Sequence, residues 1–333
     1  MASSGFESIT IEGFKSIKSI QISLRPINLL IGANGSGKSN FLDAFVFLGE
    51  DQAGHMDSYV ERNGGAERLL HYGSRTTQLI SVQAYTHDGW SSDAGGIFVG
   101  GDQLARVTSK GGLTKEEQTF RRYRFNDTSD DSPLKKTAAI DDNRYLRPDG
   151  GNLAAFLYLL KRRHENSYEQ IRKAAQQVAP FLEDFQLTPR ALNPDTIRLE
   201  WRHKHSDAYF NAASFSDGTL RFIAIATLFL QPVELRPSVI LLDEPELGLH
   251  PFAIELLASL IRQASKDTQV IAATQSPLLL DYFDPEDILV ADREDGATTI
   301  KRLKSEPLAE WLKEYSLGQL WEKGEFAGRP VKE

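Results

Sequence analysis

The sequence predicts an α/β protein built around a mostly parallel β-sheet, and three observations support this. Two short apolar runs, residues 27–31 and 239–242, are typical of strands buried on both faces. A glycine-rich or acidic turn follows each run, and a segment with helical periodicity comes next. After residue 214, strand and helix signals alternate, which favours a parallel sheet with helices on its faces. The predicted elements of this half are helix 217–230, strand 238–242, helix 251–264, strand 268–274, helix 277–283 and strand 287–291.

The N-terminal part predicts an antiparallel sheet beside this core. Residues 6–12 and 17–24 show period-two alternation on either side of a turn at Gly13 to Ser16. Pro26 ends the second of these strands, because proline cannot donate a ladder hydrogen bond. Further strands are expected at residues 77–86, 97–99 and 104–107.

The middle of the chain predicts a small subdomain. Residues 152–178 change to helical periodicity, and Pro180 follows closely. Residues 185–201 indicate two short strands around Asn-Pro-Asp. We therefore expect residues 126–184 to form a helical lid or arm inserted in a head. The head would comprise residues 1–125 and 185–333.

A glycine-rich stretch after the first buried run predicts a phosphate-binding loop. Gly32 to Ser39 fits G-x-x-x-x-G-K-[ST] at every fixed position. Gly35 and Gly37 allow backbone conformations that direct N–H groups inward, and the following helix N-terminus favours an anion. Lys38 is placed to reach the β- and γ-phosphates, and Ser39 to ligate Mg²⁺. The predicted ATP-binding residues are Gly32, Asn34, Gly35, Ser36, Gly37, Lys38, Ser39 and Asn40.

Carboxylates follow the second buried run. Asp243 and Glu244 come directly after it, at the strand end where ligands bind in open α/β sheets. We expect Asp243 to hold Mg²⁺ and Glu244 to orient or deprotonate the attacking water. With Glu246, three acidic groups lie within four positions, which a nearby cation would stabilise.

Between these motifs, residues 214–230 (SFSDGTLRFIAIATLFL) begin with a helix N-cap pattern. The order GANGSGKSN, FSDGTLRF, ILLDEPELGLHP and IAATQSP resembles the ABC-type ATPases of the RecF/SMC group, especially compact stand-alone bacterial members of the kind called AAA family ATPases. The opening ITIEGFKSI is similar to the first hairpin of that group, and residues 316–330 are similar to the tails of one subset. The resemblance is weak between about 50 and 210. It implies a P-loop NTPase with an ABC-type head.

The resemblance also implies roles for single residues. Gly32 to Asn40 would be the Walker A loop, Asp243 the Walker B metal ligand and Glu244 the catalytic glutamate. Leu247 to His250 would form the D-loop region, and Gln275 would stand at the catalytic switch position after strand 268–274. The signature residues would be Ser216, Asp217 and Gly218.

Three departures from the group's pattern bear on activity. Asp217 replaces the first glycine of the transporter-type signature and brings negative charge near phosphate. Gln275 stands where many relatives have histidine and cannot accept a proton, so slow turnover is expected. The Q-loop glutamine has no clear match, and the alternatives considered are Gln78, Gln83 and Gln103, with Gln83 preferred.

In this group the signature of one subunit contacts the nucleotide of another, so the resemblance implies an ATP-dependent homodimer. The expected function is a slow, Mg²⁺-dependent ATPase switch. It would act on DNA or control a separate effector, such as a nuclease, in DNA repair or antiviral defence. Two alternatives stay open: the motor subunit of a membrane transporter, and a module that holds ATP without hydrolysing it. Ser216 lies 178 residues after Lys38, which leaves too few residues for a long coiled-coil arm.

Composition limits the remaining possibilities. Cysteine is absent, the N-terminus lacks a secretory pattern, and no apolar run approaches the roughly 20 residues that cross a bilayer, so we expect a cytoplasmic protein without a membrane span.

Net charge is −8, yet residues 101–173 hold 15 Lys/Arg against 11 Asp/Glu. Basic clusters at residues 121–124 and 161–163 indicate either DNA contacts or solvated surface, with solvated surface favoured. Lys15 could approach ribose or phosphate, and residues 292–295 faintly suggest an acidic metal site.

Overall fold

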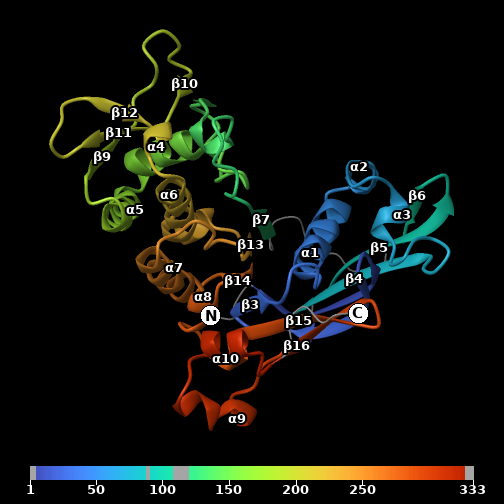
Figure 1. Ribbon diagram of the computed structural model, residues 1–333. Coiled ribbons are helices and arrows are strands. Elements are labelled where there is room, and N and C mark those ends of the chain that lie inside the picture. The colour runs from blue at the N-terminus through green and yellow to red at the C-terminus, as the bar shows by residue number, and fades with distance from the viewer. Residues whose placement is uncertain (1–4, 88–90, 108–119, 327–333) are drawn as a thin grey trace. The chain divides into compact units, whose positions relative to one another are not determined.

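A computed structural model describes residues 5–87, 91–107 and 120–326 of the 333-residue chain (Figure 1). It has the predicted α/β fold. The chain forms two compact units. The first unit comprises Met1–Arg122, Ser238–Asp243 and Ser265–Glu333, and the second comprises Tyr123–Pro237 and Glu244–Ala264.

A six-stranded sheet carries the strands on which the predicted motifs lie. Its strand order is β16-β15-β3-β14-β13-β7. The four central strands run parallel, as the buried apolar runs predict, and β16 is antiparallel at one edge. The bounds are β3 (Ile27–Ile31), β7 (Phe120–Tyr123), β13 (Val239–Asp243), β14 (Gln269–Ala273), β15 (Ile288–Glu294) and β16 (Ala297–Arg302).

The first unit also contains the expected antiparallel sheet, with strand order β2-β1-β4-β5-β6. Its strands are β1 (Phe6–Phe14), β2 (Ile17–Ser23), β4 (Leu79–Thr86), β5 (Ser91–Gly100) and β6 (Gln103–Arg106). Helix α1 (Lys38–Gln52) lies along this sheet (Figure 1) and buries Phe41, Phe45 and Phe47 against it. Phe6 and Phe14 of β1 meet Phe45 and Phe47 with ring centroids 6.0 and 5.5 Å apart. Burial of these rings therefore fixes α1, and the loop that precedes it, on the sheet.

Short helices complete the first unit. They are α2 (Met56–Arg62), α3 (Ala66–Leu69), α8 (Pro277–Leu280), α9 (Ser305–Leu308) and α10 (Leu317–Lys323). Helix α10 begins with a capping box of Ser316 and Gln319, and the Gly318 N–H donates to Asp281 at 2.7 Å. No helix in the described ranges is long and apolar enough to cross a membrane.

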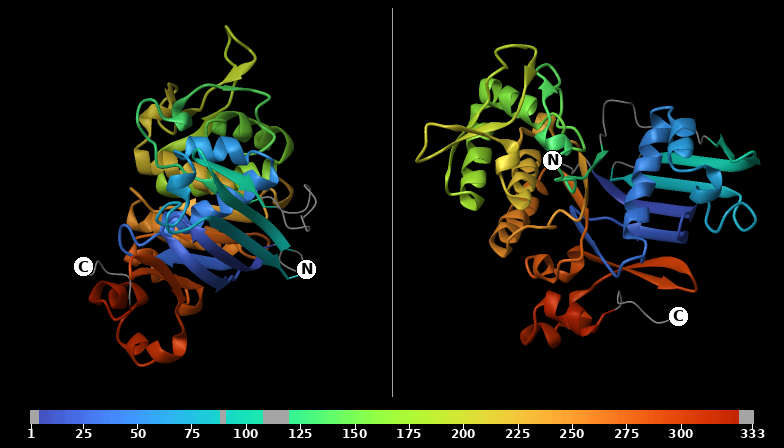
Figure 2. Two further views of the ribbon diagram at one scale, coloured as in Figure 1. Left: turned by 90° about the vertical axis from the view of Figure 1, so that its right-hand side faces the viewer. Right: turned by 45° about the horizontal axis from the view of Figure 1, so that its top comes forward.

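The second unit contains several longer helices and short strands (Figure 2). Helix α5 packs against α4 and α6, and α6 packs against α7. Strands β9 and β12 flank β11 in a three-stranded antiparallel sheet, and β8 pairs with β10. The bounds are α4 (Leu153–Arg163), α5 (Glu165–Val178), α6 (Asp217–Leu230), α7 (Pro251–Ala264), β8 (Ala138–Ala139), β9 (Leu182–Gln186), β10 (Thr196–Ile197), β11 (Glu200–His203) and β12 (Tyr209–Asn211).

Two sequence-based assignments differ from the observed elements. The sequence predicts two short strands around Asn-Pro-Asp within residues 185–201, but β9 pairs with β11, and β10 pairs with the distant β8. Non-local pairing of this kind leaves no periodic signal in a short strand. Strand β16 was also missed, although Asp295-Gly296 before an alternating run is a hairpin signal.

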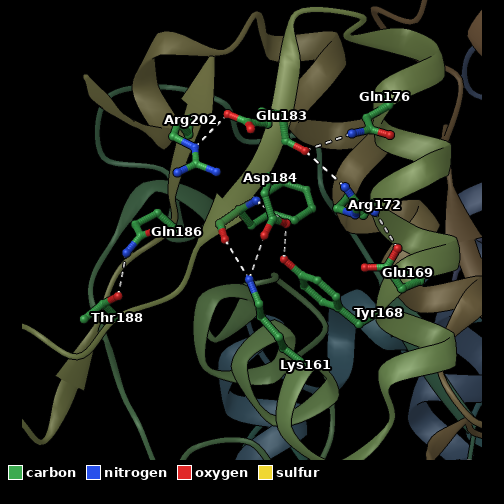
Figure 3. Close-up of polar contacts among 11 residues, drawn as sticks. Lys161, Tyr168, Glu169, Arg172, Gln176, Glu183, Asp184, Gln186, Thr188 and Arg202 are labelled. Atoms are coloured by element: carbon green, nitrogen blue, oxygen red, sulfur yellow. Dashed lines mark hydrogen bonds and ion pairs between the residues drawn. The ribbon is translucent and has the colours of Figure 1, made fainter. Parts of the chain in front are cut away.

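A polar cluster joins α4, α5 and β9 in the second unit (Figure 3). The Asp184 carboxylate accepts hydrogen bonds from Lys161 Nζ at 2.8 Å and from the Tyr168 hydroxyl at 2.6 Å. Burial alone would raise the pKa of Asp184, but these hydrogen bonds outweigh it and hold the pKa below its ordinary value. Burial, together with the bond to Asp184, raises the pKa of Tyr168. The charged form of Asp184 therefore stabilises this unit.

We predict that Asp184→Asn lowers the free energy of unfolding by about 1 kcal/mol at pH 7, since it removes charge-assisted hydrogen bonds. A carboxylate with a depressed pKa stabilises the folded protein fully at pH values above its ordinary pKa, which is near 4. This stabilisation is lost as the pH falls through the lower pKa of the folded state. The difference in the free energy of unfolding between wild type and variant should therefore shrink at acid pH. Urea unfolding from pH 7 to pH 3 measures it.

Glu183→Gln is the matched control on the same strand. The side chains of its ion pair with Arg202 are 43% and 42% exposed, more than those of the Asp184 pair, and exposed pairs contribute little. Equal losses for Asp184→Asn and Glu183→Gln, or a loss for Asp184→Asn that does not depend on pH, would contradict the assignment.

Candidate functional site

Three adjacent strands of the first unit bring the predicted motifs to one edge of the six-stranded sheet. Asp243, at the end of β13, pairs in register with Ala273 of β14, which pairs with Leu30 of β3. Because the three strands are parallel, their carboxyl ends lie side by side. The phosphate loop follows β3 and Gln275 follows β14. Neighbouring strands thus deliver the loop, the predicted switch residue Gln275 and the predicted metal ligand Asp243 to the same edge.

The phosphate loop has the backbone conformation that its glycines predicted. Gly35 and Gly37 have φ of 81° and 103°, values that residues with a Cβ rarely adopt. A Cβ on Gly37 would lie 2.0 Å from Thr298 Oγ1, so the approach of β16 also requires glycine there. The Thr298 hydroxyl donates to Ser36 O at 2.9 Å, and Asn40 Nδ2 donates to Ser16 Oγ at 2.7 Å. The loop is therefore held in place by β16 and by the β1–β2 turn.

The polar groups of this loop fit a polyphosphate. Lys38 Nζ donates to the carbonyl oxygens of Gly32 at 2.7 Å and Ala33 at 3.0 Å, so the ammonium lies across the loop. The Ser36 hydroxyl is buried and has no hydrogen-bond partner among the described residues. A buried unsatisfied hydroxyl is costly, and a ligand acceptor would relieve that cost. Ser39, the predicted metal ligand, is exposed in the first turn of α1.

Side chains of alternating charge form a chain of contacts that ends at Asp243, the predicted metal ligand. Lys15 Nζ lies 2.6 Å from Asp43 Oδ2, and the Arg122 guanidinium contacts both Asp43 and Asp243. The distance from Arg122 Nη2 to Asp243 Oδ2 is 2.6 Å, and the two side chains are only 8% and 10% exposed. We call these four residues the ion-pair chain. Lys15 thus lies beside α1, paired with a carboxylate.

Glu244 has a strained backbone. Its φ is 49°, in the left-handed region that is uncommon for a residue with a side chain. Such strain clusters at functional sites, where the surrounding structure holds it in place. Because the backbone becomes left-handed at Glu244, directly after Asp243, the side chains of these two residues do not alternate as they would in a continuing strand.

Sequence reasoning did not identify Arg122 as part of this site. The strand beside β13 is β7, which carries Arg122, whereas the glutamines considered for the Q-loop belong to or adjoin the antiparallel sheet. Those glutamines are Gln78, Gln83 and Gln103. The basic cluster at residues 121–124 was the available signal, but charge alone did not separate a buried ion pair from a surface contact.

The predicted signature residues lie at the start of α6 in the second unit. Ser216 is the N-cap: its hydroxyl accepts a hydrogen bond from the Thr219 N–H at 3.2 Å. Ser216 and Asp217 are exposed. Lys135 Nζ lies 3.9 Å from the Asp217 carboxylate and offsets part of its charge. A 14-residue helix therefore presents its positive dipole end at the protein surface.

Gly218 is required by close packing within the second unit. A Cβ at this position would lie 2.4 Å from Gly248 O, in the predicted D-loop. Arg221, one turn later, is buried and donates to the carbonyl oxygens of Phe125 and Asn126 at 3.0 and 3.1 Å. Burial lowers the pKa of Arg221, while the carboxylates of Asp217 and Glu246 oppose this. The signature turn and the D-loop thus form one packed assembly.

The start of α6 is also fixed by aromatic stacking. Phe215 stacks on Trp201 of β11 with ring centroids 4.6 Å apart, and Phe210 of β12 stacks on Trp201 at 4.9 Å. The Trp201 indole N–H donates to Asn211 O at 3.1 Å. The three-stranded sheet therefore anchors the residue that precedes Ser216.

Two weaker sequence signals concern an acidic metal site at residues 292–295 and the basic clusters. In the described part of the chain, no group of three or more His, Cys, Asp or Glu residues is arranged to hold a metal, including residues 292–295. Mg²⁺ keeps most of its water and commonly takes one or two protein ligands, so this finding is compatible with Ser39 and Asp243. In the basic clusters, the Arg122 side chain is largely buried and Lys161 pairs with Asp184, so both cations are engaged within the protein.

Comparison with protein families gives two matches. Residues 112–281 match the family described as "AAA domain, putative AbiEii toxin, Type IV TA system". Residues 6–142 match the family described as "AAA ATPase domain". Together they cover the phosphate loop, the signature, the carboxylate cluster and Gln275.

Comparison with individual proteins supports the fold. An Smc head bound to the C-terminal winged-helix domain of ScpA has a TM-score of 0.62 at 19% identity, covering 92% of this chain and 99% of the other. An Smc head with an extended coiled coil, bound to the C-terminal domain of ScpA derived from Pyrococcus furiosus, has a TM-score of 0.56 at 16% identity, covering 93% and 98%. Urease accessory protein 2 of Cryptococcus neoformans var. grubii is 33% identical over 149 residues, 43% of this chain but only 12% of that protein.

We predict that Glu244→Gly is more stable to urea than Glu244→Ala by about 1 kcal/mol. Both variants lack the carboxylate, so the comparison isolates the left-handed backbone, which glycine adopts without steric cost. At an ordinary position alanine would be the more stable of the two. If the alanine variant equals or exceeds the glycine variant, residue 244 does not hold this conformation in solution.

Proposed function

The chain belongs to the family described as "AAA domain, putative AbiEii toxin, Type IV TA system", and we propose that it is a slowly hydrolysing, ATP-dependent dimeric switch. The family match and the Smc-head-like fold support an ATPase of the SMC and AAA type. The observation that carries the proposal is the convergence of the phosphate loop, Gln275 and Asp243 on adjacent parallel strands.

The proposed roles follow from the residues at this edge. Lys38 would transfer its hydrogen bonds from loop carbonyls to phosphate oxygens, and the Ser36 hydroxyl would gain an acceptor. Ser39 and Asp243 would hold Mg²⁺, which when bound supplies positive charge to the phosphates. Glu244 would accept a proton from the attacking water, and Gln275 would orient that water by hydrogen bonding. A switch residue that cannot exchange protons supports slow turnover.

The exposed start of α6 supports action between two copies of the chain. Ser216 and the N–H groups of the first helical turn form a site suited to a phosphate. We propose that a second copy supplies this phosphate, so that two ATP molecules are enclosed between two subunits. ATP then favours the dimer by mass action, and hydrolysis releases it.

We propose that this cycle controls a separate effector protein, and that the chain does not itself bind along a stretch of DNA. Of the basic clusters, Arg122 belongs to the ion-pair chain, Lys161 pairs with Asp184, and Arg162 lies 5.3 Å from the Tyr158 ring. These engaged cations weaken the case for a continuous phosphate-binding surface. Purification of tagged Glu244→Gln protein with ATP from its native host would show which partner accompanies the dimer, with nuclease treatment separating DNA-mediated from direct association.

We predict that Lys38→Ala weakens ATP binding by about a hundredfold or more, because the variant loses charge-assisted hydrogen bonds to phosphate. Fluorescent ATP titration of the purified protein measures this. Lys18→Ala, an exposed lysine of the same unit, is the matched control and should bind like wild type. Equal affinity of Lys38→Ala and wild type would exclude the phosphate loop as the ATP site.

We predict that Ser216→Arg abolishes ATP-driven dimerisation while each monomer keeps its ATP affinity, because the long cation blocks the surface that meets the partner's phosphate. Light scattering with ATP, in a Glu244→Gln background that retains nucleotide, measures the mass. Ser216→Asp should have the same effect, although aspartate keeps the helix cap. Ser214→Arg, an exposed neighbour, should still dimerise. A Ser216→Arg protein that dimerises normally with ATP would disprove the enclosed-nucleotide arrangement.

A further inference from the structure

Arg122 joins the two carboxylates of the ion-pair chain through different nitrogens. Nη1 contacts Asp43 Oδ1 of α1, and Nη2 lies 2.6 Å from Asp243 Oδ2 at the end of β13. We propose that Arg122 is an exchangeable counter-ion: it pairs with Asp243 in the nucleotide-free protein, and Mg²⁺ must replace it there. This inference rests on the proposed function, in which Asp243 is a metal ligand.

The distribution of charge shows which carboxylate depends more on Arg122. Asp43 has a second cation, because Lys15 Nζ lies 2.6 Å from its Oδ2. Loss of Arg122 would therefore leave Asp43 paired. The Asp243 side chain is nearly buried, at 10% exposure, and a charge at such a position depends strongly on a close counter-ion. Arg122 therefore places a positive charge 2.6 Å from a nearly buried carboxylate.

The shape of the guanidinium permits an exchange. Arginine stays charged at every accessible pH, so its departure depends on a competing cation rather than on a proton. Its fork can keep the Nη1 contact with Asp43 while Nη2 releases Asp243. A dication at Asp243 would repel the nearby guanidinium, and free metal must therefore compete with a cation already in place. The negative charge of a triphosphate would shift this competition toward the metal.

The test uses Mn²⁺ alone, with nucleotide-free full-length protein and electron paramagnetic resonance to count free Mn²⁺. Arg122→Gln removes the competing charge and keeps a polar side chain, and we expect about tenfold tighter Mn²⁺ binding than in wild type. Arg124→Gln, an exposed arginine two positions away, is the matched control and should bind like wild type. Adding Asp243→Asn to Arg122→Gln should remove the gained affinity.

Two results would overturn the inference: unchanged Mn²⁺ affinity in Arg122→Gln, or a tighter site that persists after Asp243→Asn. ATP titration in EDTA provides a further test, because an Arg122→Gln protein that loses metal-free ATP binding would make Arg122 a phosphate ligand instead. If Arg122→Gln does not fold, Arg122→Lys keeps the charge without the fork and should show a smaller gain in the same direction. Wild-type protein with the expected Mn²⁺ behaviour but no ATP binding would instead contradict the proposed function.

Discussion

The need to compensate charge at the end of an apolar sheet is the constraint on which the rest of this structure depends. β3, β13 and β14 are fully buried, and such strands cannot solvate the groups that follow them. The ends of β3 and β13 are matched by specific partners. Lys38 lies on loop carbonyls, and Asp243 pairs with Arg122. In the proposed function, phosphate and metal would replace these partners.

The second constraint is that neighbouring atoms lie close to the backbone at a few positions, and it explains where glycine is required. Gly37 faces the Thr298 side chain, and Gly218 faces the Gly248 carbonyl, at distances that leave no room for a Cβ. In the first case β16 supports the phosphate loop. In the second, the helix that carries Ser216 contacts the loop that follows the carboxylate cluster. Both pairs of segments are therefore closely packed, the first against a side chain and the second against a backbone carbonyl.

Much of the fold could be predicted because its elements are long, regular and locally encoded. Helix 217–230 and strand 27–31 have the predicted bounds, since an apolar stripe or a continuous apolar run specifies them. The G-x-x-x-x-G-K-S stretch likewise located the loop between β3 and α1. β7 was missed because it is short and lies beside β13, which is distant in the sequence, whereas β16 was missed although the Asp295-Gly296 hairpin signal precedes it. The sequence therefore indicates the ligand-binding loop more clearly than the strands that support it.

Arg122 shows why the remainder of the site was not predictable. Its neighbours Arg121 and Arg124 suggested a basic surface, and formal charge carries no information on burial. Only the pairing of β7 beside β13 brings the guanidinium to Asp243. The residues Lys15, Asp43, Arg122 and Asp243 come from four separate parts of the sequence, yet they form one chain of alternating sign. An electrostatic network of this kind is a property of strand order, and a motif search that reads one segment at a time cannot detect it.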